Sequence, residues 1–425
     1  MFNQNGLSLD QAPPISVVFR FFLMGTLFGI FAGISLLFYK ENIFDATSVE
    51  ARIFIHLLTL GVMLSFMFAA LFQMLPVIAG ISLSSPIKRA NILLYPFALG
   101  IPLLLLGFQT LLSWAYLTAG VLLGGSLLLT IAPMLIELFS LSHHTSSSKG
   151  MWYALIALGI VSVLALYLLL FLGGFSEGTW YVTVKTVHYS FGRFGWIALL
   201  ILSISFQVIE MFYVTPSYPA YFTRYWTFCI FIVLLGSSLL SLFFTQAWYV
   251  GDSLLMLLFA SYALITLKLL SQKKRPLSDA TVWFWKIGLL LLLLSVVTMV
   301  IANVTQIYLL KALSSIFFAF FALSIVFAMF YKIVPFLTWF HLSSQGYFTA
   351  PMMHEVIHPK TAMRHLYIHL ATLVSFILSL FVLSFIIIAG LLTILSFAWM
   401  AWQIIHAWRL YLHTQKNGEK FTPQP

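Results

Sequence analysis

Six ionisable side chains lie inside long apolar stretches of the sequence and are the first candidates for chemistry. They are His56, Glu137, His188, Arg193, Glu210 and Lys332. An ionisable group inside a bilayer costs about 2.5 kcal/mol or more, so such groups are seldom placed there without a function. Each is therefore expected to bind a ligand, to line a polar path or to pair with another charge.

The two histidines are candidate metal ligands. Each lies about one turn inside the outer end of its apolar stretch, and neutral imidazole is a good ligand for heme iron or copper. The alternative is an interfacial histidine that binds water or backbone. His56 precedes Gln73 by seventeen residues, and His188 precedes Gln207 by nineteen. At about 100° per residue these offsets place the rings on different helix faces, so the two sites are not equivalent.

Arg193 is a candidate for holding an anionic group. It lies five residues beyond His188, which is about 7 Å deeper along a helix. A guanidinium there can hold a carboxylate, such as a heme propionate, through two parallel hydrogen bonds. The alternative is an arginine that snorkels toward water or caps helix carbonyls.

Polar residues near the inner ends of the same apolar stretches suggest a second kind of site. Gln73, Gln207, Glu210 and Lys332 can line a polar path for a solute. Alternatively, Glu210 and Lys332 form one buried ion pair. The pair is favoured, because a buried charge without a partner is costly.

A histidine-rich segment precedes and enters the eleventh apolar stretch. Its histidines are His341, His354, His358, His365 and His369. Residues 354–358 match the H-E-x-x-H pattern of zinc proteases, which works only when both histidines share one helix face. Pro351 and Pro359 flank this pattern and predict an interrupted helix, hence a solvated polar loop or, at most, a loose metal site. His365 and His369 are spaced by one turn, which is ordinary for a membrane interface.

The composition indicates that these residues are positioned by membrane-spanning helices. Of the residues, 62% are hydrophobic and 8% are charged, against about 25% charged in soluble domains. The apolar runs are continuous rather than alternating, which predicts helices and excludes barrel strands. The net charge of +10 lies in short loops and does not indicate nucleic-acid binding. The single cysteine, Cys229, excludes an intrachain disulfide and a cysteine-based metal site.

Twelve apolar stretches predict twelve transmembrane helices that fill one polytopic domain over residues 1–425. We expect them at residues 15–38, 52–80, 91–112, 114–141, 152–173, 187–214, 225–246, 250–270, 282–304, 309–339, 363–384 and 386–411. Eleven lysines and arginines lie in the even-numbered loops and the C-terminal tail, against four in the odd-numbered loops. The positive-inside rule then places both termini in the cytoplasm, in what we expect to be a bacterial inner membrane.

Helices 2, 6 and 10 have similar inner ends, which suggests an internal repeat. Each ends in an aromatic residue, a long polar residue, two apolar residues and a proline or charge, at 72–76, 206–210 and 331–335. Gly61 and Gly195 both lie twelve residues before the glutamine. The pattern predicts three four-helix repeats at about 1–150, 151–281 and 282–425, related by a pseudo-threefold axis. The alternative is chance similarity among apolar sequences.

Twelve helices in three pseudo-repeats, with histidines near the outer ends of helices 2 and 6, resemble subunit I of heme-copper oxidases and nitric-oxide reductases. The stretch from His56 through Gly61 to Gln73 is similar to that family's helix 2, and the stretch from His188 through Gly195 to Gln207 looks like a second copy. The resemblance implies that His56 binds heme b and that His188 is a copper-type ligand.

The sequence departs from that family at most of its metal ligands. The family has two histidines on helix 7 and two on helix 10, but residues 225–244 and 309–339 contain none. A complete oxygen-reducing site is therefore not expected. The resemblance implies an electron carrier, sensor or assembly factor that works beside other membrane or respiratory-complex subunits. A transporter or channel that uses the buried polar residues, or a structural subunit without a cofactor, are the alternatives.

Overall fold

The protein contains twelve helices that are long and apolar enough to cross a membrane, and it is an integral membrane protein. A computed structural model describes residues 12–40, 42–81, 83–244, 247–274 and 278–420. The helices found within these residues account for nearly all of the described chain. Arg275, one of the basic loop residues counted above, lies outside the described part.

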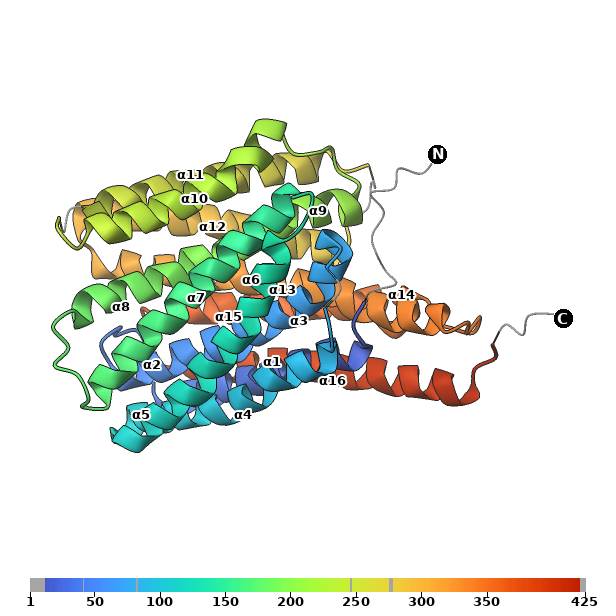
Figure 1. Ribbon diagram of the computed structural model, residues 1–425, viewed down its shortest axis with the longest axis horizontal. Coiled ribbons are helices and arrows are strands. Elements are labelled where there is room, and N and C mark those ends of the chain that lie inside the picture. The colour runs from blue at the N-terminus through green and yellow to red at the C-terminus, as the bar shows by residue number, and fades with distance from the viewer. Residues whose placement is uncertain (1–11, 41, 82, 245–246, 275–277, 421–425) are drawn as a thin grey trace. The chain divides into compact units, whose positions relative to one another are not determined.

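The elements follow one another along the chain as helices joined by short connections (Figure 1). Their bounds are α1 (Ile15–Phe38), α2 (Val49–His56), η2 (Leu57–Leu64), α3 (Ser65–Ala79), α4 (Pro86–Thr110), α5 (Ser113–Gly120), η3 (Val121–Gly125), α6 (Ser126–Phe139), α7 (Ser146–Leu172), α8 (Tyr181–Ser190), η4 (Phe191–Ala198), α9 (Leu199–Tyr213), α10 (Ala220–Leu240), α11 (Ala247–Ser271), α12 (Ala280–Thr305), α13 (Tyr308–Ser344), α14 (Met353–Val356), α15 (Pro359–Ser379) and α16 (Phe385–Asn417). The three η elements are π-helical and lie inside longer helices.

All twelve predicted spans are confirmed, and several begin earlier than the apolar pattern predicts. The fifth span begins at Ser146 and the second at Val49. In both cases a polar side chain caps the helix: Thr145 accepts a hydrogen bond from the Ser148 N–H, and Ser48 accepts one from the Ala51 N–H. Such caps satisfy otherwise free N–H groups and let a helix start in polar sequence outside the apolar run.

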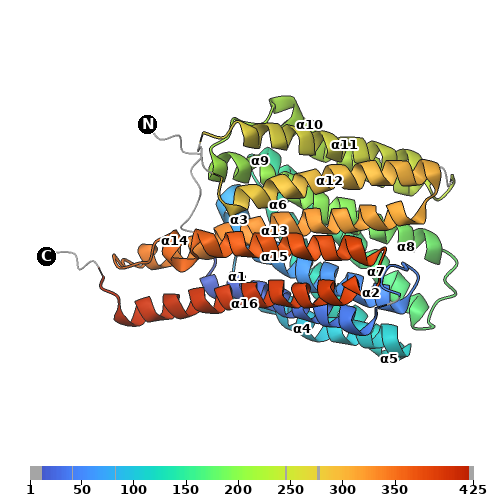
Figure 2. The same cartoon turned by 180° about the vertical axis from the view of Figure 1, so that it is seen from behind.

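The chain divides into two compact units. Unit 1 comprises residues 1–12, 73–276 and 289–322, and unit 2 comprises residues 13–72, 277–288 and 323–425. Within unit 1, α7 packs against α8 and α9, and α10 packs against α11 (Figure 1). Within unit 2, α16 packs against both α1 and α15, and α15 and α16 run side by side in Figure 2.

Small residues allow α1 and α16 to approach closely in unit 2. Gly29 and Gly33 lie one turn apart on the face of α1 that packs against α16, whereas Gly25, one turn earlier, packs against Phe66 of α3. A Cβ atom on Gly33 would lie 2.8 Å from the main-chain oxygen of Gly390 in α16. The sequence contains this small-residue spacing, which is typical of tightly packed transmembrane helices.

The π-helical segments of the second and sixth spans, η2 and η4, start at the same distance in sequence from Gln73 and Gln207. The element η2 begins at Leu57 and η4 begins at Phe191, so each starts sixteen residues before Gln73 or Gln207 and runs for eight residues. Their glycines, Gly61 and Gly195, are places of close packing. π-Helical segments are rare and occur often at functional sites. The threefold repeat itself stays a prediction, since it requires the placement of the two units.

Gly195→Ala is expected to destabilise unit 1, whereas Gly192→Ala in the same π-helix is expected to have little effect. A Cβ on Gly195 would lie 2.7 Å from the Ala157 Cβ, but a Cβ on Gly192 has no neighbour within 4 Å. Overpacking of this kind costs about 1–3 kcal/mol. Thermal unfolding of the purified protein in detergent measures the difference. Equal melting temperatures for the two variants would contradict the close packing at Gly195.

Candidate functional site

His56 is the last residue of α2 and lies directly before the π-helix η2. Its ring is half-buried, and its Nδ1 atom lies 2.8 Å from the Arg52 carbonyl oxygen one turn earlier. Because a carbonyl oxygen can only accept a hydrogen bond, this contact places the ring proton on Nδ1. The lone pair of the neutral imidazole is then on Nε2.

His188 lies in α8, three residues before the π-helix η4, and makes the same kind of contact. Its Nδ1 atom lies 3.1 Å from the Val161 carbonyl oxygen on α7, and its ring is half-buried. The hydrogen bond joins two helices rather than two turns of one helix. It therefore fixes the orientation of the ring in unit 1 and again puts the lone pair on Nε2.

Arg193 lies inside η4 and is buried, with 7% of its surface exposed. Its guanidinium donates to the Tyr189 hydroxyl at 2.6 Å and to the Ser295 hydroxyl at 3.2 Å. The Phe318 ring lies 4.2 Å from the guanidinium carbon, a distance at which an aromatic face stabilises a cation. No acidic side chain among the described residues forms a direct ion pair with it, but the Asp252 carboxyl on α11 interacts electrostatically with it at longer range.

The structure directs His188 and Arg193 toward different neighbours. His188 contacts α7 through Val161, whereas Arg193 contacts α12 through Ser295 and α13 through Phe318. Their closeness in sequence therefore does not translate into a shared set of contacts. An anionic group held by Arg193 and a metal held by His188 need not belong to the same ligand.

Lys332 and Glu210 each have a different partner from the one expected. Lys332 forms an ion pair with Asp279 at 2.7 Å, and both residues belong to unit 2. In unit 1, the Glu210 carboxylate accepts hydrogen bonds from the Tyr218 N–H at 3.0 Å and the Ser217 hydroxyl at 3.1 Å. Glu210 thus holds the loop that follows α9, a role that the sequence pattern does not reveal.

Asp279 lies just before α12 and is held ionised by its surroundings. Burial alone would raise the pKa of this carboxyl, but the Lys332 ammonium and hydrogen bonds from Thr281 and the Val282 N–H outweigh it, so the pKa is lowered. The favourable contribution to stability is therefore present above the normal carboxyl range and is lost as the pH falls through the lowered value.

The glutamines of the second and sixth spans, in α3 and α9, differ in burial. Gln73 is buried, and neither atom of its side-chain amide has a hydrogen-bond partner among the described residues. Gln207 is half-buried. A buried amide without partners costs about 1–3 kcal/mol, so Gln73 remains a candidate for lining a polar path. The path itself stays a prediction.

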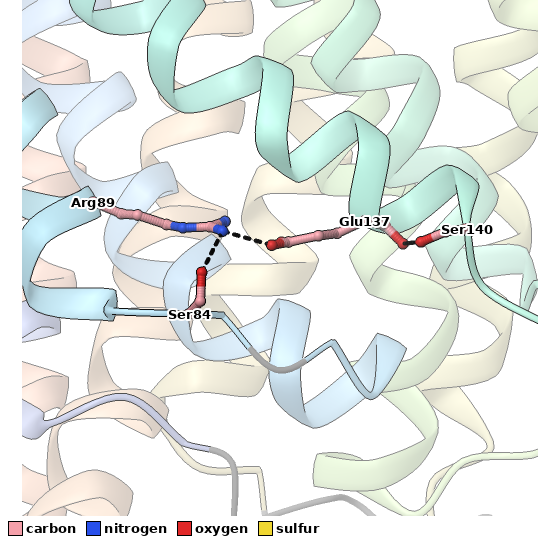
Figure 3. A network of polar contacts seen from close by, with 4 residues as sticks. All are labelled: Ser84, Arg89, Glu137 and Ser140. Carbon is pink, nitrogen blue, oxygen red and sulfur yellow. Dashed lines mark hydrogen bonds and ion pairs between the residues drawn. The ribbon is translucent and has the colours of Figure 1, made fainter.

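Glu137, the remaining ionisable candidate, belongs to an ion pair that the sequence does not indicate. Figure 3 shows its carboxylate directed toward the Arg89 guanidinium, at 2.7 Å, with Ser84 as a second acceptor for the same arginine at 2.8 Å. The pair joins α4 to α6 in unit 1. Glu137 therefore has a structural role, because it pairs with Arg89 in the first turn of α4.

The H-E-x-x-H segment is interrupted, as the flanking prolines predict. The helix α14 ends at Val356, Ile357 is extended, and His358 caps the start of α15. Both histidines of the pattern are exposed. The Glu355 carboxylate accepts a hydrogen bond from the Met352 N–H at 2.7 Å. The confirmed break separates the two histidines onto different elements.

The interpretation of His365 and His369 as interfacial residues is wrong. They are 0% and 2% exposed, respectively, in unit 2. Their Nε2 atoms pair with the hydroxyls of Ser396 on α16 at 2.7 Å and Ser324 on α13 at 2.8 Å. The physical reason is that neighbouring helices supply the polar partners that water would otherwise provide. The signal in the sequence is their alignment at one-turn spacing with the buried residues Thr372, Phe376 and Ser379.

Within the described residues, no group of three histidine, cysteine or acidic side chains is placed to hold a metal ion. The candidate ligands therefore occur one at a time, at His56 in unit 2 and at His188 in unit 1. What is established is a multi-span membrane protein with isolated candidate ligands. The sequence matches no family model and no curated protein.

Proposed function

We propose that this membrane protein binds heme in the outer half of the bilayer, with His56 or His188 as an axial ligand. The observation that carries the proposal is the hydrogen bond from each Nδ1 to a main-chain carbonyl. Histidines that bind metals usually donate their other ring N–H in this way, which fixes the tautomer and makes Nε2 a better ligand. Both histidines also adjoin a π-helix, a feature common at functional sites.

Heme suits the available donors better than a protein-bound copper ion. A porphyrin supplies four of the iron ligands itself, so a single histidine is enough for a five-coordinate iron. Copper needs several protein ligands, and the described residues offer no cluster of three. The seventh and tenth spans, at residues 225–244 and 309–339, also lack the histidines of the oxidase family. The proposed role is accordingly electron transfer, sensing or assembly of a membrane complex rather than complete oxygen reduction.

The proposal predicts that the purified protein has a Soret absorption band and that the band depends on His56 or His188. His56→Ala, His188→Ala and the double variant remove the candidate ligands, while His144→Ala in an exposed loop is the matched control. Heme content per protein, measured by absorption and by extraction, should fall in at least one single variant and be lost in the double variant. Unchanged heme content in the double variant would contradict the assignment of both ligands.

Transport of an anion is the second candidate, favoured by the buried charge of Arg193. In the described part of the chain the guanidinium has hydroxyl partners and aromatic neighbours but no directly paired carboxylate, and Asp252 interacts with it only at longer range. A bound anion would compensate such a charge. If the purified protein contains no heme, uptake of small carboxylates by proteoliposomes and its loss in Arg193→Lys would support this alternative.

A further inference from the structure

A second polar site, separate from His188 and Arg193, lies inside unit 2. It consists of His365 and His369 on α15 with the hydroxyls of Ser396 and Ser324, as described above. The rings of Phe284 and Phe327 contact both histidines, at centroid distances between 4.9 and 5.9 Å. Two titratable side chains thus share one apolar, aromatic environment in the interior of unit 2.

The site contains a polar atom, the His365 Nδ1, that is enclosed by protein and has no hydrogen-bond partner among the described residues. The Tyr331 hydroxyl and the Trp399 Nε1 are enclosed as well. The Tyr331 and His365 rings lie 5.6 Å apart, and the Trp399 indole lies near the Tyr331 hydroxyl. A polar atom left without a partner in such a place costs about 1–3 kcal/mol. The site therefore has spare capacity to donate and accept hydrogen bonds.

The site extends to the middle of its transmembrane helix. His369 is ten residues from either end of α15, which corresponds to about 15 Å. His365 is one turn closer to the start of the helix, about 9 Å from Pro359. The two rings thus occupy successive levels between the start of α15 and its middle.

Farther along, α15 approaches the helix that carries His56. Phe376, two turns beyond His369, contacts Phe54 with a centroid distance of 6.0 Å. Phe54 precedes His56 by two residues in α2. Unit 2 therefore places histidines at three levels, on neighbouring parts of α15 and α2.

We propose that His365 and His369 form a proton relay, which takes protons from the side where α15 begins and passes them toward the level of His56. Ionisable residues that face the interior of a membrane bundle are typical of proton relays. A neutral imidazole accepts a proton on one ring nitrogen and, as imidazolium, releases one from the other, so no oxidant or reductant is needed. The titratable side chain in contact with the pair is Tyr331 on α13.

A proton fits this site better than a metal ion does. Serine hydroxyls occupy the Nε2 atoms of both histidines, and the described residues hold no cluster of three metal-binding side chains. The His365 Nδ1 atom has no hydrogen-bond partner in the described part of the chain and is enclosed by protein. A proton is a ligand that this imidazole nitrogen can bind without displacing its neighbours.

The test is the proton permeability of vesicles that contain the purified protein and a trapped pH-sensitive dye. A potassium gradient with valinomycin provides the driving force. The wild type should acidify faster than protein-free vesicles, and His365→Gln and His369→Gln should reduce the rate to the protein-free level. Glutamine keeps a hydrogen-bonding group for the serines but does not bind a proton in this pH range. His406→Leu on the exposed side of α16 is the control and should match the wild type.

The proposal is overturned if the wild type is no faster than protein-free vesicles, or if folded glutamine variants conduct as well as the wild type. Size-exclusion profiles and melting temperatures identify the folded variants. If a glutamine variant does not fold, the proton permeability of Ser324→Ala is compared with that of the wild type. This variant removes the hydroxyl that pairs with the His369 Nε2 atom and leaves both rings in place. The result is independent of heme content, which is measured on the same preparations, so this inference and the proposed function fail separately.

Discussion

Replacing Gly33 with leucine is expected to prevent stable folding of unit 2. A Cβ at this position would lie 2.8 Å from the Gly390 carbonyl oxygen and 2.8 Å from the Ile394 main-chain nitrogen. These are main-chain atoms, so they cannot move aside by a change of rotamer. The two helices would have to separate along their length, at a cost of about 3 kcal/mol or more. The yield of monodisperse protein and the melting temperature in detergent measure the effect.

Gly159→Leu is the matched control for the Gly33 variant. Gly159 lies within α7, and a Cβ there would have no neighbour within 4 Å. The same leucine should therefore be accepted with little change in melting temperature. If both variants fold equally well, the close approach of α1 and α16 is not a requirement of the fold.

Arg193→Glu is expected to have the second large effect, because it puts a negative charge where the surroundings suit a cation. The faces of Phe318 and Phe194, 4.2 and 5.0 Å from the guanidinium carbon, attract positive charge and repel a carboxylate. A buried charge without a partner costs about 3–5 kcal/mol. Unit 1 should lose stability by a comparable amount, measured as a lower melting temperature and a lower yield.

Lys185→Glu reverses a charge on the same transmembrane helix and serves as the control. Lys185 is exposed in α8, so water screens the new carboxylate and the stability should hardly change. Arg193→Lys keeps the charge but loses the planar pair of donors to Tyr189 and Ser295. It should fall between the wild type and Arg193→Glu. A fully stable Arg193→Glu protein would show that the site does not select for positive charge.

The twelve spans are predictable from the sequence because membrane insertion depends on a local property, the length of an apolar run. The first span even has the predicted bounds, Ile15–Phe38. Helix starts such as Ser146 are less predictable, because a cap at Thr145 extends the helix into polar sequence. Composition therefore determines how many helices cross the membrane, while single side chains determine where they begin.

The partners of the buried polar residues are much harder to predict. Lys332 pairs with Asp279, fifty-three residues away in sequence, and His369 pairs with Ser324, forty-five residues away. These contacts depend on which helices are neighbours and on how each helix is rotated about its axis. The apolar pattern of a membrane helix predicts neither of these. The burial of His369 is indicated by its spacing from other buried residues of α15, but no sequence pattern indicates its serine partner.

The depth of His369 has an electrical consequence. With ten residues of α15 on either side, a proton that reaches this ring from either surface crosses about half of the membrane field. For a potential of 100 mV this is about 1.2 kcal/mol, half of the value for a full crossing. The occupancy of the ring would then change about sevenfold when the membrane is energised or collapsed. Protonation of a histidine in this position would then respond to voltage as well as to proton concentration.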